Sequence, residues 1–201
     1  MPLIRPFPGL RPLPDKAAEV AAPPYDVLDS NEARKRAAGK PWSFLHISKP
    51  EIDLPPGTDP FSPAVYAMGK ENFDRMLKEG VLRQDSAPCY YLYRLIMGNH
   101  QQTGLAAAAH VADYDINRIR KHEFTRPDKE DDRVRQVDTL SAQTGPVFLT
   151  YKHDAAIDEL AAKATAAEPE TDLVADTGVR HSLWVIRDAA QLDFITGAFD
   201  A

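Results

Sequence analysis

The chain has 201 residues and a mass of 22.3 kDa, enough for one compact domain with its own hydrophobic core. Its 24 basic and 30 acidic residues give a formal net charge of −6, the opposite balance to that of a general nucleic-acid binder. The single cysteine, Cys89, excludes an internal disulfide and a thiol-only zinc site. Prolines and an arginine interrupt residues 1–9 where a signal peptide would be apolar, so we expect a cytoplasmic protein without membrane contacts.

The first half of the chain is predicted to combine extended segments with two helices, one strand and a loop. Frequent prolines favour short extended segments over residues 3–25. The apolar spacing and the terminal glycines predict two helices, one capped at Asp29 or Ser30 and the other ended by Gly80. The predicted elements are a helix over 29–39, a strand over 42–47, a loop over 51–63 and a helix over 64–80.

The second half alternates predicted strands and helices. Gly98 and the two residues after it indicate a hairpin between two strand-like runs. The predicted elements are strands over 89–97 and 103–112, a helix over 127–143, a buried strand over 147–151, a helix over 154–167, strands over 173–175 and 181–186, and a helix over 189–199. We therefore predict a single α+β (mixed α/β) domain over residues 1–201, with a mostly mixed or antiparallel sheet flanked by helices.

Basic residues are densest between residues 118 and 135. Lys129 and Arg133 are four residues apart on the predicted helix 127–143 and therefore share one face. Along that face Val137 and Leu140, together with Val134, form the predicted core stripe. We therefore expect Arg133 to lie at the edge of the core and to point along a groove.

His122, Glu123 and Thr125 precede this helix at a predicted strand-to-helix junction. Here the cations and the helix N–H groups can hold a phosphate or carboxylate, and Glu123 or His122 can move a proton. The alternative is purely structural, because acids at positions 128 and 130–132 complement the helix dipole and repel a bare anion. The spacing of the His-Glu-Phe-Thr run differs from that of a zinc-protease motif.

Tyr25 and Asp26 form a second candidate site, because Pro23 and Pro24 hold them in a rigid extended segment. Asp26 can serve there as a base, a metal ligand or a hydroxyl acceptor. The alternative is a turn in which Asp26 caps local backbone and Tyr25 packs on the sheet.

Several short runs occur in a characteristic order along nearly the whole chain. They are Ile4–Arg11, Ala22–Val27, Phe44–Ile47, Gly80–Asp85, His122–Thr125 with Lys129 and Asp132-Arg133, and His181–Ile186. In combination they resemble the bacterial and archaeal family called domain of unknown function 1015. The resemblance implies a relationship to the ParB-like superfamily, which includes nucleotide-dependent partition proteins, sulfiredoxins and free-serine kinases. Family members are typically longer and continue into an Asp-Gly-His-His-Arg run, so we expect this chain to be an N-terminal portion.

We therefore expect a domain that binds a nucleotide or another small phosphorylated ligand and is related to ParB-like phosphotransferases. As an enzyme it would be a nucleotide-dependent phosphotransferase that uses Mg²⁺ with ATP or another nucleotide. The alternative is a non-catalytic regulatory module that contacts protein or DNA through residues 118–135. No residue is assigned as a metal ligand. The candidate catalytic residues are Glu123, His122 and Asp26, and the candidate phosphate- or nucleotide-binding residues are Thr125, Lys129, Arg133 and Tyr25.

Overall fold

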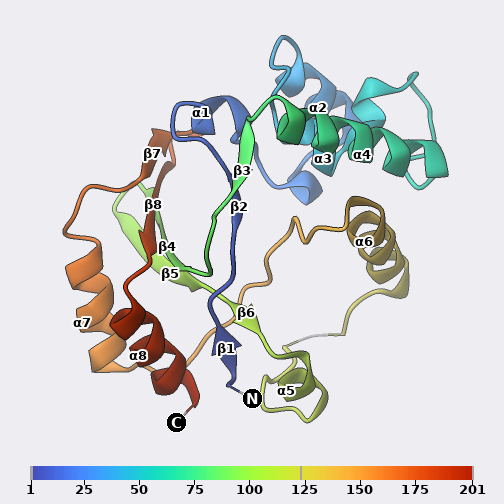
Figure 1. Ribbon diagram of the computed structural model, residues 1–201. Helices are drawn as coiled ribbons and strands as arrows, with labels where there is room; N and C mark the ends of the chain where they lie inside the picture. The colour runs from blue at the N-terminus through green and yellow to red at the C-terminus, as the bar shows by residue number, and fades with distance from the viewer. Residues whose placement is uncertain (1, 123, 201) are drawn as a thin grey trace. The chain divides into compact units, whose positions relative to one another are not determined.

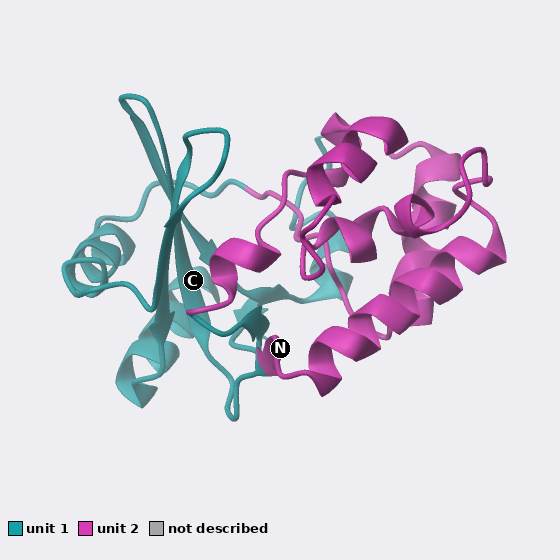
Figure 2. Ribbon diagram, turned by 90° about the horizontal axis from the view of Figure 1, so that it is seen from above, with its two compact units in different colours: residues 1–14, 84–123, 150–201 teal, residues 15–83, 124–149 magenta. Residues whose placement is uncertain are grey.

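The computed structural model describes residues 2–122 and 124–200, and the chain forms two compact units (Figure 2). Unit 1 comprises residues 1–14, 84–123 and 150–201, and unit 2 comprises residues 15–83 and 124–149. Helices and antiparallel strands are combined in the chain, which confirms the predicted α+β fold class. No helix among the described residues is both long and apolar enough to cross a lipid bilayer.

Unit 1 contains most of the β-structure. Its elements are β1 (Ile4–Arg5), β2 (Leu10–Pro12), β4 (Tyr90–Met97), β5 (His100–Ala106), β6 (Ala108–Ala109), α5 (Val111–Asp115), α7 (Ala155–Ala164), β7 (Thr171–Val174), β8 (Arg180–Ile186) and α8 (Ala189–Asp200). A four-stranded antiparallel sheet has the order β5-β4-β8-β7, and β1 pairs with β6 in a separate antiparallel sheet. The hairpin predicted at Gly98 joins β4 to β5, and Gly98 has the positive φ of 58° that such a turn requires.

Helices α7 and α8 cover one face of the four-stranded sheet (Figure 1). Leu92 of β4 lies opposite Trp184 of β8, and both side chains are buried beneath these helices. Ile195 of α8 is also fully buried in this cluster. Alternate residues of a strand point to the same face, so one face of β4 and β8 supplies the core of unit 1.

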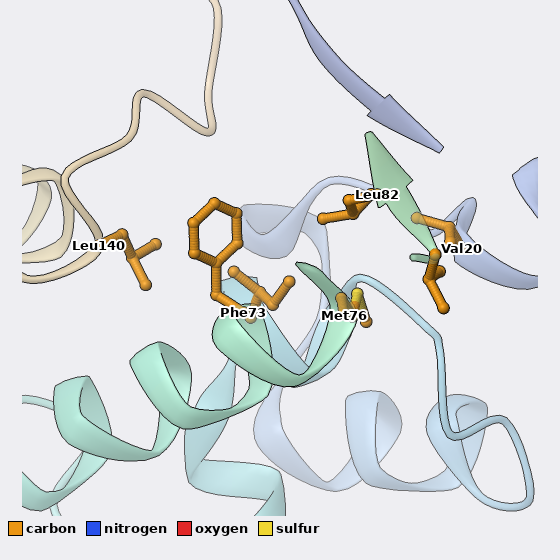
Figure 3. Packing of buried hydrophobic residues seen from close by; sticks show 7 residues of the cluster. Val20, Phe73, Met76, Leu82 and Leu140 are labelled. Atoms are coloured by element: carbon orange, nitrogen blue, oxygen red, sulfur yellow. The ribbon is translucent and has the colours of Figure 1, made fainter. Parts of the chain in front are cut away.

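Unit 2 is mostly helical. Its elements are α1 (Ala17–Val20), the 3₁₀ turn η1 (Tyr25–Val27), α2 (Ser30–Ala37), α3 (Leu45–Ser48), the 3₁₀ turn η2 (Pro50–Asp53), α4 (Pro63–Lys78) and α6 (Pro127–Leu140). Strand β3 (Leu82–Gln84) lies where the chain passes from unit 2 into unit 1. Figure 3 shows the main core of the unit, in which Phe73 and Met76 of α4 pack with Val20, Leu82 and Leu140.

Local signals in the sequence place helix α2 correctly. The Asp29 carboxylate accepts hydrogen bonds from the backbone N–H groups of Asn31 and Glu32, both at 2.8 Å. The Glu32 side chain in turn accepts from the Asp29 N–H, which completes a capping box. The predicted cap at Asp29 is therefore confirmed.

The strand predicted over residues 42–47 is wrong, because this segment contains helix α3. Leu45 packs in a cluster with Ala33 and Ala37 of α2, whereas Ile47 packs with Phe73 and Met76 of α4. A single helical turn between two helices therefore buries both side chains. Short apolar runs fit a strand and a buried helical turn equally well, and here packing decides between them.

The buried strand predicted over residues 147–151 is also wrong. This segment has no regular secondary structure, and the exposed fractions of Val147 and Phe148 are 76% and 77%. A strand needs a hydrogen-bonded partner as well as a suitable composition. The segment has no strand partner among the described residues, so its composition alone does not make it a strand.

Candidate functional site

Helix α6 begins at Pro127, as predicted, but a different face of it is buried. Asp132, Gln136 and Leu140, each four residues after the last, point into unit 2. The predicted core stripe is therefore wrong at Val134, which is 61% exposed. Two buried polar residues are tolerated on this face because each has a hydrogen-bond partner; Gln136, for example, donates to the carbonyl of Ile47 at 2.8 Å.

Asp132 connects α6 to α4 and also orients Arg133. The Tyr66 hydroxyl of α4 donates to Asp132 Oδ1 at 2.8 Å. Arg133 donates to Asp132 Oδ2 from Nη2 at 2.6 Å and from Nε at 3.2 Å. Burial, together with the hydrogen bond to Asp132, raises the pKa of Tyr66 to about 12. Tyr66 is therefore protonated at neutral pH and remains a donor to Asp132.

Tyr25 and Arg133, far apart in the sequence, lie together in unit 2. The Arg133 guanidinium carbon is 4.2 Å from the centroid of the Tyr25 ring, within the range of a cation–π contact. Tyr25 lies in η1, directly after Pro23 and Pro24. Tyr25 therefore contacts helix α6, whereas the alternative interpretation predicts that it packs on a sheet.

The guanidinium of Arg133 keeps hydrogen-bonding capacity. Asp132 engages Nε and Nη2, and Tyr25 covers one face of the group. Within residues 2–122 and 124–200, no hydrogen bond is formed by Nη1. The arginine is thus fixed in position while part of its donor set remains open.

Lys129 lies one turn before Arg133 on the same helix. Its Nζ is 5.7 Å from the centroid of the Phe61 ring, a second cation–π contact. No carboxylate of the described part of the chain lies within ion-pair distance of Lys129. The two predicted phosphate-binding cations therefore belong to one unit and one helix.

Thr125 and the first turn of α6 form local contacts. The Thr125 hydroxyl donates to Glu130 Oε2 at 2.8 Å, and Arg126 pairs with Asp128 at 2.8 Å. For Thr125 to donate to a phosphate, its hydroxyl must leave Glu130. Its role in phosphate binding stays a prediction.

The candidate catalytic residues are not brought together within one unit. Asp26 is an exposed residue of η1 in unit 2, whereas His122 is an exposed residue of unit 1. Glu123 lies outside the described residues. The predicted strand-to-helix junction is wrong, since α5 and an irregular segment precede this position and Asn117 has a φ of 63°. Such a left-handed residue interrupts an extended run.

Sequence spacing gives no indication of a second charged cluster, which lies in unit 1. Arg11 donates to Asp85 through Nε and Nη2, both at 2.8 Å, and the Tyr91 hydroxyl donates to the same carboxylate at 2.8 Å. The hydrogen bond from Arg11, then that from Tyr91, hold the pKa of Asp85 at about 2. Arg187 and Glu170 complete the cluster. Arg11 and Asp85 lie in motifs that indicate the family, but only folding brings them together.

We expect Tyr66→Phe to destabilise the protein by about 1 kcal/mol, because buried Asp132 loses a hydrogen-bond donor. Urea unfolding monitored by fluorescence measures this difference. Tyr114→Phe is the matched control, since Tyr114 is exposed and removal of its hydroxyl costs little. Equal midpoints for the two variants would contradict this role of Tyr66.

Comparison with known proteins identifies a family. No curated protein and no solved structure matches the chain. The family model described as "Protein of unknown function (DUF1015)" matches residues 4–201. This match covers nearly the whole chain and agrees with the order of its motifs, so the chain belongs to the DUF1015 family.

Proposed function

We propose that unit 2 binds the phosphate group of a nucleotide or another phosphorylated metabolite through Arg133 and Lys129 of α6. The strongest support comes from the contacts of Arg133. Hydrogen bonds to Asp132 and a cation–π contact with Tyr25 fix its guanidinium group, while Nη1 can still donate a hydrogen bond to a ligand. An arginine that is already fixed loses little conformational freedom when it binds a ligand. Its planar group also matches the geometry of a phosphate.

Two cations of α6 support an anion beside Arg133, and Mg²⁺ bound to the ligand would offset the remaining acids at positions 130 and 131. Asp132 offsets one positive charge, and Lys129 supplies a second one without a described carboxylate partner. Arg126 offsets Asp128 in the first turn of the helix. The dipole of the helix also favours an anion near its N-terminus. These features support a phosphate beside Lys129 and Arg133.

In this proposal Mg²⁺ binds together with the nucleotide, as a complex with its phosphate oxygens. No three His, Cys, Asp or Glu side chains of the described residues are grouped so that they could hold a metal. Mg²⁺ commonly binds phosphate oxygens and retains several waters. We therefore assign its coordination mainly to the nucleotide and name no protein ligand for it.

Phosphoryl transfer, and with it the relationship to ParB-like phosphotransferases, is the more specific form of this proposal. The protein would position the phosphate, and a carboxylate or imidazole would accept the proton of the attacking hydroxyl. Within unit 2 the candidate for that base is Asp26, and the roles of His122 and Glu123 stay predictions from the sequence. Asp26 is exposed to solvent, and it is adjacent in the chain to Tyr25, which contacts Arg133.

A non-catalytic interaction module is the second candidate function. The exposed apolar side chains of Val147 and Phe148 favour it, since such groups often form protein contacts. DNA is a poorer candidate partner, because the chain has a formal net charge of −6 and Arg118 and Arg126 of the basic stretch are paired with acids.

A thermal-shift titration with ATP, ADP and CTP, each with and without Mg²⁺, tests the proposed phosphate site. At about 100 times its dissociation constant, a bound ligand stabilises the fold by about 2.7 kcal/mol. For a chain of this length we expect a rise in Tm of roughly 5–10 °C. Inorganic phosphate serves as a probe of the phosphate subsite alone. A Tm that none of these ligands changes would contradict the proposal.

A further inference from the structure

Two arginines from distant parts of unit 1 converge on one carboxylate, that of Glu170. Arg11 Nη2 lies 2.9 Å from Glu170 Oε2, and Arg187 Nη2 lies 3.2 Å from the same oxygen. Arg187 Nη1 donates to the other oxygen, Oε1. Three guanidinium nitrogens therefore surround a single carboxylate, an arrangement with both the charge and the geometry of a carboxylate-binding site.

Asp85 supports the two arginines from the more buried side. It receives two hydrogen bonds from Arg11 and lies 3.5 Å from Arg187 Nη2. The Asp85 side chain is 12% exposed, whereas that of Glu170 is 33% exposed. Tyr91 fixes Asp85 with a further hydrogen bond. The arginines thus keep a buried support that does not depend on Glu170, which lies on the solvent side.

The Glu170 side chain can leave without disruption of the sheet. Its own backbone N–H donates to the carbonyl of Leu183 in β8 at 2.8 Å, which anchors the main chain. Release of the carboxylate therefore requires only rotation of the side chain, and such rotations in partly exposed residues are fast. Once it has rotated away, two positive charges and one negative charge remain, a net charge of +1 that matches a singly charged anion.

We propose that Arg11 and Arg187 form a binding site for a small-molecule monocarboxylate, which the Glu170 side chain occupies in this structure. Glu170 acts as an internal competitor, and a ligand must displace it. The apparent affinity falls in proportion to the fraction of molecules in which the site is open. This site lies in unit 1 and recognises a carboxylate, so it is independent of the phosphate site proposed on α6.

Glu170→Ala removes the internal competitor, and acetate is the probe for the open site. We expect acetate to raise the Tm of the variant in a saturable manner, whereas chloride at equal ionic strength does not. In the wild type the acetate concentration that gives half of the effect should be at least about tenfold higher.

Asp172→Ala is the matched control. The Asp172 carboxylate pairs with a single arginine, Arg180, and accepts a hydrogen bond from Ser182, so its removal opens no two-arginine site. Acetate should not stabilise this variant beyond the effect of chloride. The double variant Glu170→Ala, Arg187→Ala should also lose the response. Equal responses of Glu170→Ala and Asp172→Ala would overturn the proposal.

Glu170→Gln provides a second variant if Glu170→Ala does not fold, as judged by circular dichroism. The amide fills the same space but binds the arginines more weakly than a carboxylate, so acetate should still stabilise this variant selectively. A Glu170→Gln protein that responds to acetate no more than the wild type does would overturn the proposal. The acetate response should survive Arg133→Ala, which separates this site from the one on α6.

Discussion

Replacement of Asp85 by Asn lowers the stability of the protein by about 3 kcal/mol at neutral pH. The carboxylate is mostly buried and accepts hydrogen bonds from Arg11 and Tyr91, so the variant leaves Arg11 with Glu170 as its one remaining carboxylate partner among the described residues. In a chain of this length the loss corresponds to a fall in Tm of roughly 6–12 °C. Differential scanning calorimetry at pH 7 measures this change.

The same substitution removes part of the pH dependence of stability. The pKa of Asp85 is about 2 in the folded protein and about 3.9 in an unfolded chain. Because the folded value is the lower one, Asp85 stabilises the fold fully above about pH 5, and this stabilisation is lost as the pH falls towards 2. The difference in unfolding free energy between wild type and Asp85→Asn should therefore shrink between pH 6 and pH 3.

Asp172→Asn is the control for a general effect of removing a paired acid. Arg180 and Asp172 form a solvent-accessible pair, and its loss should cost less than about 1 kcal/mol. The role of Asp85 is refuted if the two variants have similar midpoints in urea. It is also refuted if the deficit of Asp85→Asn is as large at pH 3 as at pH 7.

The sequence analysis succeeds where the signal is local. Asp29 and Glu32 are three residues apart, so the capping box is visible in the sequence and the helix follows it. The hairpin at Gly98 is equally local. By contrast, the segment around Leu45 and Ile47 is compatible with two structures, and helices from other parts of unit 2 determine which one forms.

In the candidate site, too, features that depend on neighbouring residues are predictable from the sequence, whereas contacts between distant segments are not. Lys129 and Arg133 share a helix, and their spacing predicts their common position on α6. The contact of Arg133 with Tyr25, and that of Arg11 with Asp85, join residues that no periodicity relates. The predicted core stripe of α6 is right at Leu140 and wrong at Val134, because polar Asp132 and Gln136 occupy the buried face with hydrogen bonds that a hydrophobic pattern does not reveal.

Replacement of Arg133 by Ala should weaken nucleotide binding by about one to two orders of magnitude, because hydrogen bonds to charged groups contribute about 1.5–3 kcal/mol. The fold should remain, since Tyr66 still donates to Asp132 and the Arg133 side chain is partly exposed. Arg133→Lys keeps the charge but loses the planar group that reaches Asp132 and stacks on Tyr25, so its affinity should be intermediate. Isothermal titration with the nucleotide that gives the largest thermal shift measures both changes.

Arg135→Ala is the matched control for Arg133→Ala, because it removes the same charge from an exposed position of the same helix. If binding depends on the fixed guanidinium of Arg133, Arg135→Ala should keep nearly the wild-type affinity. If only the overall positive charge of α6 matters, the two alanine variants should weaken binding equally, and Arg133→Lys should bind like the wild type. The second pattern would exclude a specific phosphate site at Arg133, whereas the first would link the contacts with Asp132 and Tyr25 directly to ligand recognition.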